Sequence, residues 1–433
     1  MPASLTEWLS LLERRHPREV DLGLDRVRAV WERLGSPVPA KRCVVVAGTN
    51  GKGSTVAVIR AVLERLGLRC GTYTTPHIHA YNERVGFAGR LADDRQFTEA
   101  FERIEAARGD VSLSYFEFGT LAAFLILQDQ GLDCAVMEIG LGGRLDAVNL
   151  LDGDCTVITP IGLDHQEYLG DTREAIGREK AGIIRRGRPL VIGDRDPPDS
   201  VLETARERAA PVRRIGIDFE LSARGEQAVF RYGDRSVALP RPTLAGAHQF
   251  DNAATGLAAV LELEPEAIGR GAALRSGMQS VRLRGRFERV ADAPAVWLDV
   301  GHNPLGAEVV ARTLEQRMRV EKITRVHCVL GMLADKDAGA AARALGGVVA
   351  DWYCAGLGSN RGQSGAQLAE QVRAAVAPAT VRACGTVAEA LAAALKDAKP
   401  TDGVLVFGSF LTVDAALDAL AAATGSDGTT VPA

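Results

Sequence analysis

The sequence has few cysteines and few lysines, and it has no long apolar run. Its seven cysteines are an odd number, no two form a C-x-x-C pair, and most lie in apolar, strand-like stretches. This pattern favours reduced core thiols and predicts a cytoplasmic location. No stretch is apolar over enough residues to span a membrane, and the N-terminus, which carries Glu7 and Glu13, does not read as a signal peptide.

Positive charge is not in excess either. The chain has 51 lysine and arginine residues against 55 aspartate and glutamate residues, so its formal net charge is −4. Without a basic field there is no electrostatic basis for nucleic-acid binding, and any anionic ligand must be held by local charge. The 433 residues, 46% of them hydrophobic, are enough for two or three domains.

The sequence is organised around a glycine loop. The apolar run Arg42–Ala47 leads into Gly48-Thr49-Asn50-Gly51-Lys52-Gly53-Ser54, which we call the phosphate loop, and a helical pattern follows from Val56. A strand, a glycine loop and a helix in this order favour phosphate binding, because backbone N–H groups approach the phosphate oxygens and Lys52 adds a full positive charge. The spacing is tighter than G-x-x-x-x-G-K, and Gly53 replaces the usual hydroxyl residue. An ordinary strand-to-helix turn is the alternative.

Three further polar residues, Thr75, Glu138 and His165, come at or after the ends of short apolar runs. Parallel strands bring their carboxyl ends to one edge of a sheet, so we expect these residues near the phosphate loop. Glu138 stands where P-loop enzymes hold Mg²⁺, although a solvated carboxylate is the alternative. His165 follows Asp164 and could ligate a second metal, although a lone histidine is more often structural.

Lys180 lies in the apolar stretch Glu179-Lys180-Ala181-Gly182-Ile183. A lysine in such a setting loses its proton readily, and a neutral amine can add carbon dioxide to become an anionic carbamate. From the residues alone, an ion pair with Glu179 or Glu174 is the simpler interpretation.

Two regions differ from the repeated strand-and-helix pattern of the N-terminal half. The polar stretch from His79 to Arg95 is predicted to be a mobile loop, and the alternation between Val212 and Leu239 predicts short antiparallel strands.

From residue 295 onward, five apolar runs alternate with helical patterns, which indicates a doubly wound parallel sheet. We therefore predict one domain over residues 1–288 and a second over residues 289–433.

These motifs together resemble the folylpolyglutamate synthase and dihydrofolate synthase family, within the Mur ligase superfamily of ATP-dependent amide-forming ligases. The resemblance rests on the phosphate loop and on Thr75-Pro76-His77, Glu138–Ala147, Leu163-Asp164-His165, Glu179–Gly182, Asn252-Ala253-Ala254, Gly285-Arg286-Phe287 and Asp299-x-x-His302-Asn303-Pro304. It implies an α/β fold with an N-terminal P-loop ATP-binding domain around a parallel-rich sheet and a smaller, Rossmann-like C-terminal domain. One departure is Leu411, where an aromatic residue is expected.

The resemblance also implies roles for individual residues. ATP would be bound by Thr49, Asn50, Gly51, Lys52, Gly53, Ser54, Asn252, Arg286 and Asp299. Two Mg²⁺ ions would be held by Thr75, Glu138 and His165, with Ser54 as a local alternative. Pteroate would be bound by Asp21, Leu22, Gly23, Tyr115, Phe116, Glu117, Phe118, Leu145, Asp146 and Ala147. Lys180 would be an N6-carboxylysine and would act in catalysis with Lys52 and His302, which is a candidate for orienting glutamate.

The implied activity is ligation of L-glutamate to 7,8-dihydropteroate, and of further glutamates to reduced folates, through an acyl phosphate made from ATP. This chemistry belongs to folate biosynthesis and one-carbon metabolism. A synthase with only the folylpolyglutamate activity is one alternative, and a P-loop phosphotransferase is another. A monomer with no nucleic-acid or membrane partner is expected.

Overall fold

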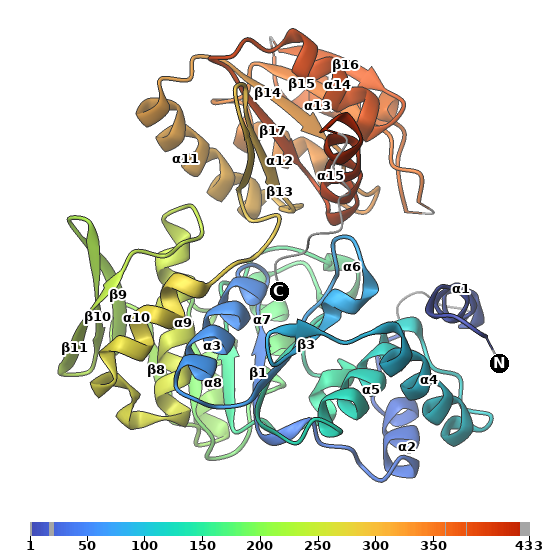
Figure 1. Cartoon of the computed structure of the whole chain (residues 1–433), viewed down its shortest axis with the longest axis vertical. Coiled ribbons are helices and arrows are strands. Elements are labelled where there is room, and N and C mark those ends of the chain that lie inside the picture. The colour runs from blue at the N-terminus through green and yellow to red at the C-terminus, as the bar shows by residue number, and fades with distance from the viewer. Residues whose placement is uncertain (1, 17–20, 360, 378, 425–433) are drawn as a thin grey trace. The chain divides into compact units, whose positions relative to one another are not determined.

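The computed structural model describes residues 2–16, 21–359, 361–377 and 379–424. The described chain divides into two compact units (Figure 1). The first runs to Thr243 and includes Phe250–Val281, and the second contains Leu244–Gln249 and the described residues from Arg282 onward. The domain boundary between residues 288 and 289 stays a prediction, and each unit is described by itself.

The first unit is built on an eight-stranded sheet with the order β4-β3-β2-β5-β1-β6-β7-β8. The strands are β1 (Ala40–Ala47), β2 (Cys70–Tyr73), β3 (Val85–Phe87), β4 (Arg90–Leu91), β5 (Leu132–Glu138), β6 (Cys155–Ile158), β7 (Leu190–Ile192) and β8 (Val212–Arg214). The six strands from β2 to β8 in this order are parallel, and β3 and β4 are antiparallel additions at one edge. The predicted parallel-rich sheet is confirmed.

The loop predicted between His79 and Arg95 is wrong in part. This stretch contains the 3₁₀ turn η1 (Tyr81–Arg84) and the hairpin β3–β4, and β3 pairs with β2 from Tyr73↔Val85 to Gly71↔Phe87. Strands of two or three residues show no sequence periodicity, and pairing with a strand already in place is what orders them.

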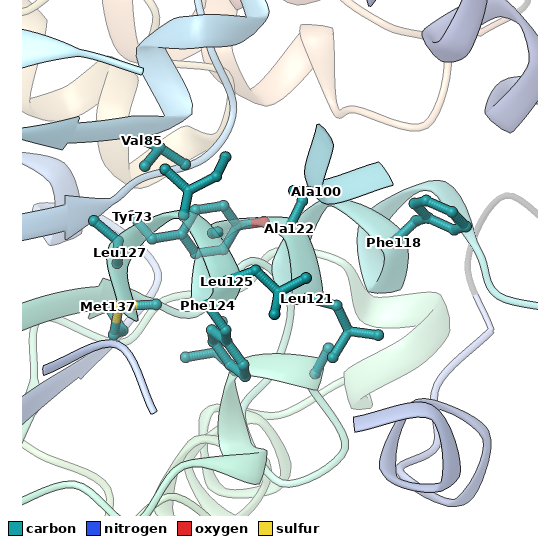
Figure 2. Packing of buried hydrophobic residues seen from close by; sticks show 14 of the residues in the cluster. Tyr73, Val85, Ala100, Phe118, Leu121, Ala122, Phe124, Leu125, Leu127 and Met137 are labelled. Atoms are coloured by element: carbon teal, nitrogen blue, oxygen red, sulfur yellow. The ribbon is translucent and has the colours of Figure 1, made fainter. Parts of the chain in front are cut away.

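One face of this sheet is covered by α1 (Leu5–Arg15), α2 (Asp25–Arg33), α4 (Asp94–Arg108) and α5 (Tyr115–Gln128), which share one apolar core with β1, β2 and β5. Figure 2 shows part of this core, where Tyr73, Val85, Phe118, Leu121 and Phe124 gather around α5. Helix α5 is buried along nearly its whole length, as its apolar sequence predicts. Helix α3 (Lys52–Arg65) contacts the same strands, but none of its residues belongs to this core.

Truncation of Phe118 should test this core. Phe118 is fully buried, and its ring centroid lies 5.5 Å from that of Phe101 and 6.2 Å from that of Trp8. Phe118→Ala leaves a cavity and should lower the free energy of unfolding by about 3–5 kcal/mol. Ile217→Ala, at a side chain that is 59% exposed, is the control and should change it little. Urea denaturation of both variants checks the difference, and equal losses would contradict the packing described.

The first unit also contains further helices, short turns and a second, smaller sheet. Its helices and turns are η2 (Ala147–Leu150), α6 (Gln166–Leu169), α7 (Arg173–Ala181), α8 (Asp199–Glu207), α9 (His248–Leu263), η3 (Pro265–Gly269) and α10 (Gly271–Ser280), and only the first two residues of α9 belong to the second unit. The predicted antiparallel strands form a separate sheet of β9 (Phe219–Arg224), β10 (Gln227–Tyr232) and β11 (Arg235–Pro240).

The second unit contains a six-stranded sheet with the order β12-β13-β17-β14-β15-β16. Its strands are β12 (Glu288–Asp292), β13 (Ala295–Asp299), β14 (Val326–Leu330), β15 (Asp351–Ala355), β16 (Thr380–Cys384) and β17 (Gly403–Phe407). All pairs are parallel except β12–β13. The helices are α11 (Pro304–Glu321), α12 (Ala338–Leu345), α13 (Gly365–Ala375), α14 (Val387–Asp397) and α15 (Phe410–Thr424). The Rossmann-like prediction is confirmed. Among the described helices of the chain, none is both long and apolar enough to cross a membrane.

Candidate active site

The strand order brings the polar residues of the first unit to one edge of the sheet. Strand β1 lies between β5 and β6, and Val46 of β1 is in register with Glu138 at the end of β5. Thr75 follows β2, which is the other neighbour of β5, and its backbone N–H donates to Glu138 Oε2 over 3.3 Å. Glu138 is only 4% exposed, whereas Thr75 is half-buried. The structure therefore places a carboxylate and a threonine side by side next to the phosphate loop.

The phosphate loop is held in a shape that only glycine accepts at two positions. Gly48 and Gly51 have φ angles of +146° and +88°, and a Cβ on Gly48 would lie 1.8 Å from Thr159 Oγ1. Gly51 directly precedes α3, so the loop ends at a helix N-terminus. Lys52 Nζ donates to the carbonyl oxygens of Gly48 and Thr49 over 3.1 and 3.2 Å, so the ammonium lies over the loop.

Asn252 of α9 lies directly against this loop. A Cβ on Gly51 would come within 2.4 Å of Asn252 Oδ1. The predicted ATP contacts Gly51 and Asn252 are thus brought together although 200 residues separate them in the sequence. Ser54 is 2% exposed, and the half-buried Thr75 is the more accessible hydroxyl at this edge.

Gly51→Ala should weaken ATP binding sharply, because its methyl group meets Asn252 and must displace that side chain. Gly67→Ala is the matched control: Gly67 has a φ of +90°, close to that of Gly51, and nothing lies within 4 Å of an added Cβ. In both variants an alanine must adopt a left-handed backbone conformation, which lowers the free energy of unfolding by about 1–2 kcal/mol. Calorimetric titration with ADP should show an affinity loss in Gly51→Ala alone, and equal ADP affinities in the two variants would contradict this geometry.

Lys180, near the end of α7, is 5% exposed. Burial, and next the positive charge of Lys52, lower its pKa to about 7, against the pull of Asp164 and Asp146. No ion pair of Lys180 is found within the described parts of the chain. The simpler interpretation from the sequence is wrong: Glu179 pairs with Arg144 over 2.9 Å, and Glu174 accepts from the backbone N–H groups of Asp199 and Ser200.

Asp146 is the other buried group beside Lys180. Its carboxylate accepts from the backbone N–H groups of Gly140, Leu141 and Val148 over 2.9–3.0 Å, and burial raises its pKa to about 6. Asp146 therefore fixes the shape of the glycine-containing loop after β5. His165 directly precedes α6 with a φ of +51°, and its backbone N–H donates to Asp164 Oδ1 over 2.9 Å.

The predicted pteroate residues meet around the N-terminus of α5. Arg26 joins two of them, because it pairs with Asp21 Oδ2 over 2.8 Å and with Glu117 Oε1 over 3.0 Å. A Cβ on Gly140 would lie 2.5 Å from the Phe116 ring and 3.4 Å from Asp146, so these two side chains approach the same loop. The half-buried members of the set are Asp21, Leu22, Gly23, Tyr115, Phe116 and Leu145, whereas Phe118 and Ala147 are buried in the core.

The sequence interpretation missed Arg84 and did not assign a role to His77. Arg84 Nε donates to His77 Nδ1 over 2.9 Å, and Arg84 is only 7% exposed. Burial, and next the charge of Arg84, lower the pKa of His77 to about 4, so this ring is neutral at neutral pH. No motif marks Arg84 in an arginine-rich sequence, and only its burial in the structure reveals it.

The second unit places three predicted residues around the end of β13. Asp299 accepts from Phe287 N and Gly301 N over 2.9 and 2.7 Å, and burial raises its pKa. The guanidinium of Arg286 lies 5.4 Å from the centroid of the Phe410 ring. His302 Nδ1 lies 3.0 Å from the carbonyl oxygen of Val300, which orients its ring.

Comparison with known proteins decides the family. Residues 46–260 match the Mur ligase middle domain, and residues 285–410 match the Mur ligase glutamate ligase domain. The chain is 41% identical to dihydrofolate synthase/folylpolyglutamate synthase of Escherichia coli (strain K12), with 94% of each chain covered. This chain belongs to the dihydrofolate synthase/folylpolyglutamate synthase family. It is also 32% identical to the Mycobacterium tuberculosis member, over 96% of this chain and 93% of that protein.

Solved structures of family members are also similar to this chain over nearly its whole length. E. coli FolC in complex with DHPP and ADP has a TM-score of 0.91 and 40% identity, with 98% of this chain and 100% of that chain covered. The Yersinia pestis enzyme complexed with AMPPNP and Mn ion has a TM-score of 0.87 and 39% identity, with coverage of 97% and 99%. The family resemblance and the fold class predicted from the sequence are therefore confirmed.

Proposed function

We propose that this protein is an ATP-dependent ligase that joins L-glutamate to 7,8-dihydropteroate and adds further glutamates to reduced folates. The observation that carries the proposal is the grouping of the phosphate loop, Thr75 and Glu138 at one sheet edge, with Lys180 of α7 close enough to Lys52 to be affected by its charge. Family membership supports it, since relatives are named for both activities and family structures contain ADP, AMPPNP or L-glutamate. A cytoplasmic monomer stays a prediction.

A carboxylate must be activated before an amine can attack it, and transfer of the γ-phosphoryl group of ATP makes the acyl phosphate. The phosphate loop would bind the ATP phosphates through its backbone N–H groups, with Lys52 offsetting their charge and Asn252 contacting the nucleotide. Arg286 and Asp299 are the proposed ATP contacts from the second unit. The attacking amine of L-glutamate must be neutral and aligned, and we assign His302 to its orientation.

The donor atoms at this edge fit magnesium. The Thr75 hydroxyl and the Glu138 carboxylate offer oxygen, which Mg²⁺ prefers, and the hydrogen bond from Thr75 N to Glu138 keeps the two residues together. We propose that they hold one Mg²⁺, with Ser54 as the alternative hydroxyl, and that His165 contributes to a second site. Bound magnesium would offset negative charge on the transferring phosphoryl group.

The lowered pKa of Lys180 is compatible with a carbamate on its side-chain nitrogen. Its pKa of about 7 leaves a large share of the amine neutral at neutral pH, and a neutral amine is the form that adds carbon dioxide. Carbamylation would replace a buried cation beside Lys52 with an anion, which turns a repulsion into an attraction. We propose N6-carboxylysine at this position.

ADP release measured with dihydropteroate, with and without L-glutamate, tests the proposal. We expect sustained ADP release only when both substrates are present, because the acyl phosphate turns over only when the amine attacks. ADP release that needs neither substrate would contradict ligation and favour a phosphotransferase. Activity with tetrahydrofolate but not with dihydropteroate would favour an enzyme with only the folylpolyglutamate activity.

A further inference from the structure

Arg84 is a cation that is buried in the first unit, and none of the described carboxylates pairs with it. It ends η1, is 7% exposed, and donates from Nε to His77 Nδ1 over 2.9 Å. Within residues 2–16, 21–359, 361–377 and 379–424, no carboxylate pairs with it. Burying a guanidinium without a counter-ion costs free energy, so this arrangement calls for another source of negative charge.

The surroundings of Arg84 are aromatic. Its guanidinium carbon lies 4.9 Å from the ring centroid of Tyr81 and 5.5 Å from that of Tyr115. Tyr73, labelled in Figure 2, is also close enough to affect it. Burial works against the charge of Arg84, but the three phenol groups outweigh it and raise the pKa of the guanidinium. Cation–π contacts stabilise a charge only in part, by roughly 0.5–2 kcal/mol each, and leave the N–H donors without an anionic acceptor.

Arg84 is connected to the proposed active site on two sides. His77, which accepts its hydrogen bond, comes two residues after Thr75, and Thr74 N donates to the carbonyl oxygen of Arg84 over 2.9 Å. Tyr115 belongs to the first turn of α5, in the segment assigned to pteroate. The group that must lie between the phosphate-transfer edge and a pteroate site is the carboxylate that receives the phosphoryl group.

We propose that Arg84 binds and positions the carboxylate of the pteroyl substrate that is to be phosphorylated. This inference rests on the proposed function and adds a residue to it. The planar guanidinium matches a carboxylate with two parallel hydrogen bonds, and the rigid aromatic contacts hold it in a fixed orientation. The substrate carboxylate supplies the counter-charge that no carboxylate among the described residues provides.

The test compares two ligands, dihydropteroate and its carboxamide, in which a neutral amide replaces the carboxylate. Binding of each to the full chain is measured by calorimetry with ADP present. Wild type should prefer the carboxylate, and Arg84→Met should lose roughly 10- to 100-fold in affinity for it while its affinity for the carboxamide changes little. In turnover assays, the same variant should raise the KM for dihydropteroate and leave the KM for ATP unchanged.

Arg108→Met is the matched control. The Arg108 side chain is also largely buried, at 17% exposure, but it has its own carboxylate partner in Glu105 at 2.8 Å. This variant should lose stability without losing the preference for the carboxylate. If methionine at position 84 prevents folding, Arg84→Gln removes the charge while keeping a polar group and serves for the same comparison.

An Arg84 variant that keeps the full preference for dihydropteroate over its carboxamide would overturn the inference. An effect confined to tetrahydrofolate would overturn it as well, since the arginine would then serve a glutamyl carboxylate that does not react. Failure of wild type to bind either pteroyl ligand would instead count against the proposed function, so the two failures are distinguishable.

Discussion

Lys180→Ala should lose ligase turnover by roughly 10²- to 10³-fold, the range seen when one group that stabilises transition-state charge is removed. The variant lacks the amine that forms the carbamate and leaves a buried space beside Lys52. A small carboxylate such as acetate can enter that space and supply the missing anion. We therefore expect partial recovery of ADP release when acetate is added.

Lys41→Ala is the matched control for this experiment. The Lys41 side chain is 75% exposed and pairs with Asp133 on the surface, so its loss should leave turnover unchanged, with or without acetate. Full activity of Lys180→Ala without any additive would refute the carbamate. A ¹³C carbamate signal from wild type in ¹³C-bicarbonate, absent from Lys180→Ala, would be independent support.

The same amine gives an expected pH dependence. Because the pKa of Lys180 is lowered to about 7, the neutral form that reacts with carbon dioxide decreases as the pH falls through that value. In solutions depleted of carbon dioxide, activity should decline below about pH 7, and added bicarbonate should restore it. A decline that bicarbonate does not affect would assign the pH effect to another group.

Glu138→Gln should produce the second large effect. The substitution keeps the shape of the side chain but removes the charge that would hold a divalent cation. Apparent Mg²⁺ affinity should fall by roughly 10- to 100-fold or more, a loss typical of disrupted metal sites, and turnover should fall with it. Titration of ADP release against Mg²⁺ measures both, with added metal recovering part of the rate.

Glu262→Gln provides the control for this substitution. The Glu262 side chain is also largely buried, at 11% exposure, but it pairs with Arg213 at 2.8 Å, away from the phosphate loop. It should affect stability more than the Mg²⁺ titration. The same Mg²⁺ dependence in Glu138→Gln and wild type would remove Glu138 from the metal site.

The sequence predicted the elements whose signals are local. The run of valines before Gly48 forms β1, and the apolar residues from Phe116 to Gln128 lie in α5, because β-branched runs and helical periodicity are properties of neighbouring residues. The position of Glu138 beside the phosphate loop could also be predicted from the sequence, because the carboxyl ends of parallel strands all lie at the same edge of a sheet.

Several features depend on partners distant in the sequence. The β3–β4 hairpin exists because β2 offers it an edge, and Asn252 reaches Gly51 only after the chain has folded. The sequence interpretation gave Lys180 a carboxylate partner in Glu179 or Glu174, but tertiary contacts take both carboxylates elsewhere. Whether a buried lysine has a charged partner depends on the packed structure, and the spacing of residues in the sequence does not predict it.

The sequence by itself therefore determined the family, the α/β architecture and the phosphate loop, since glycines, a lysine and strand-end polar residues at fixed spacing carry that information locally. The tertiary structure alone decided the electrostatics of the site. Among the residues that the structure describes, Lys180 has no ion pair and Arg84 has no carboxylate partner, and the cost of a buried charge depends on what the folded chain places around it.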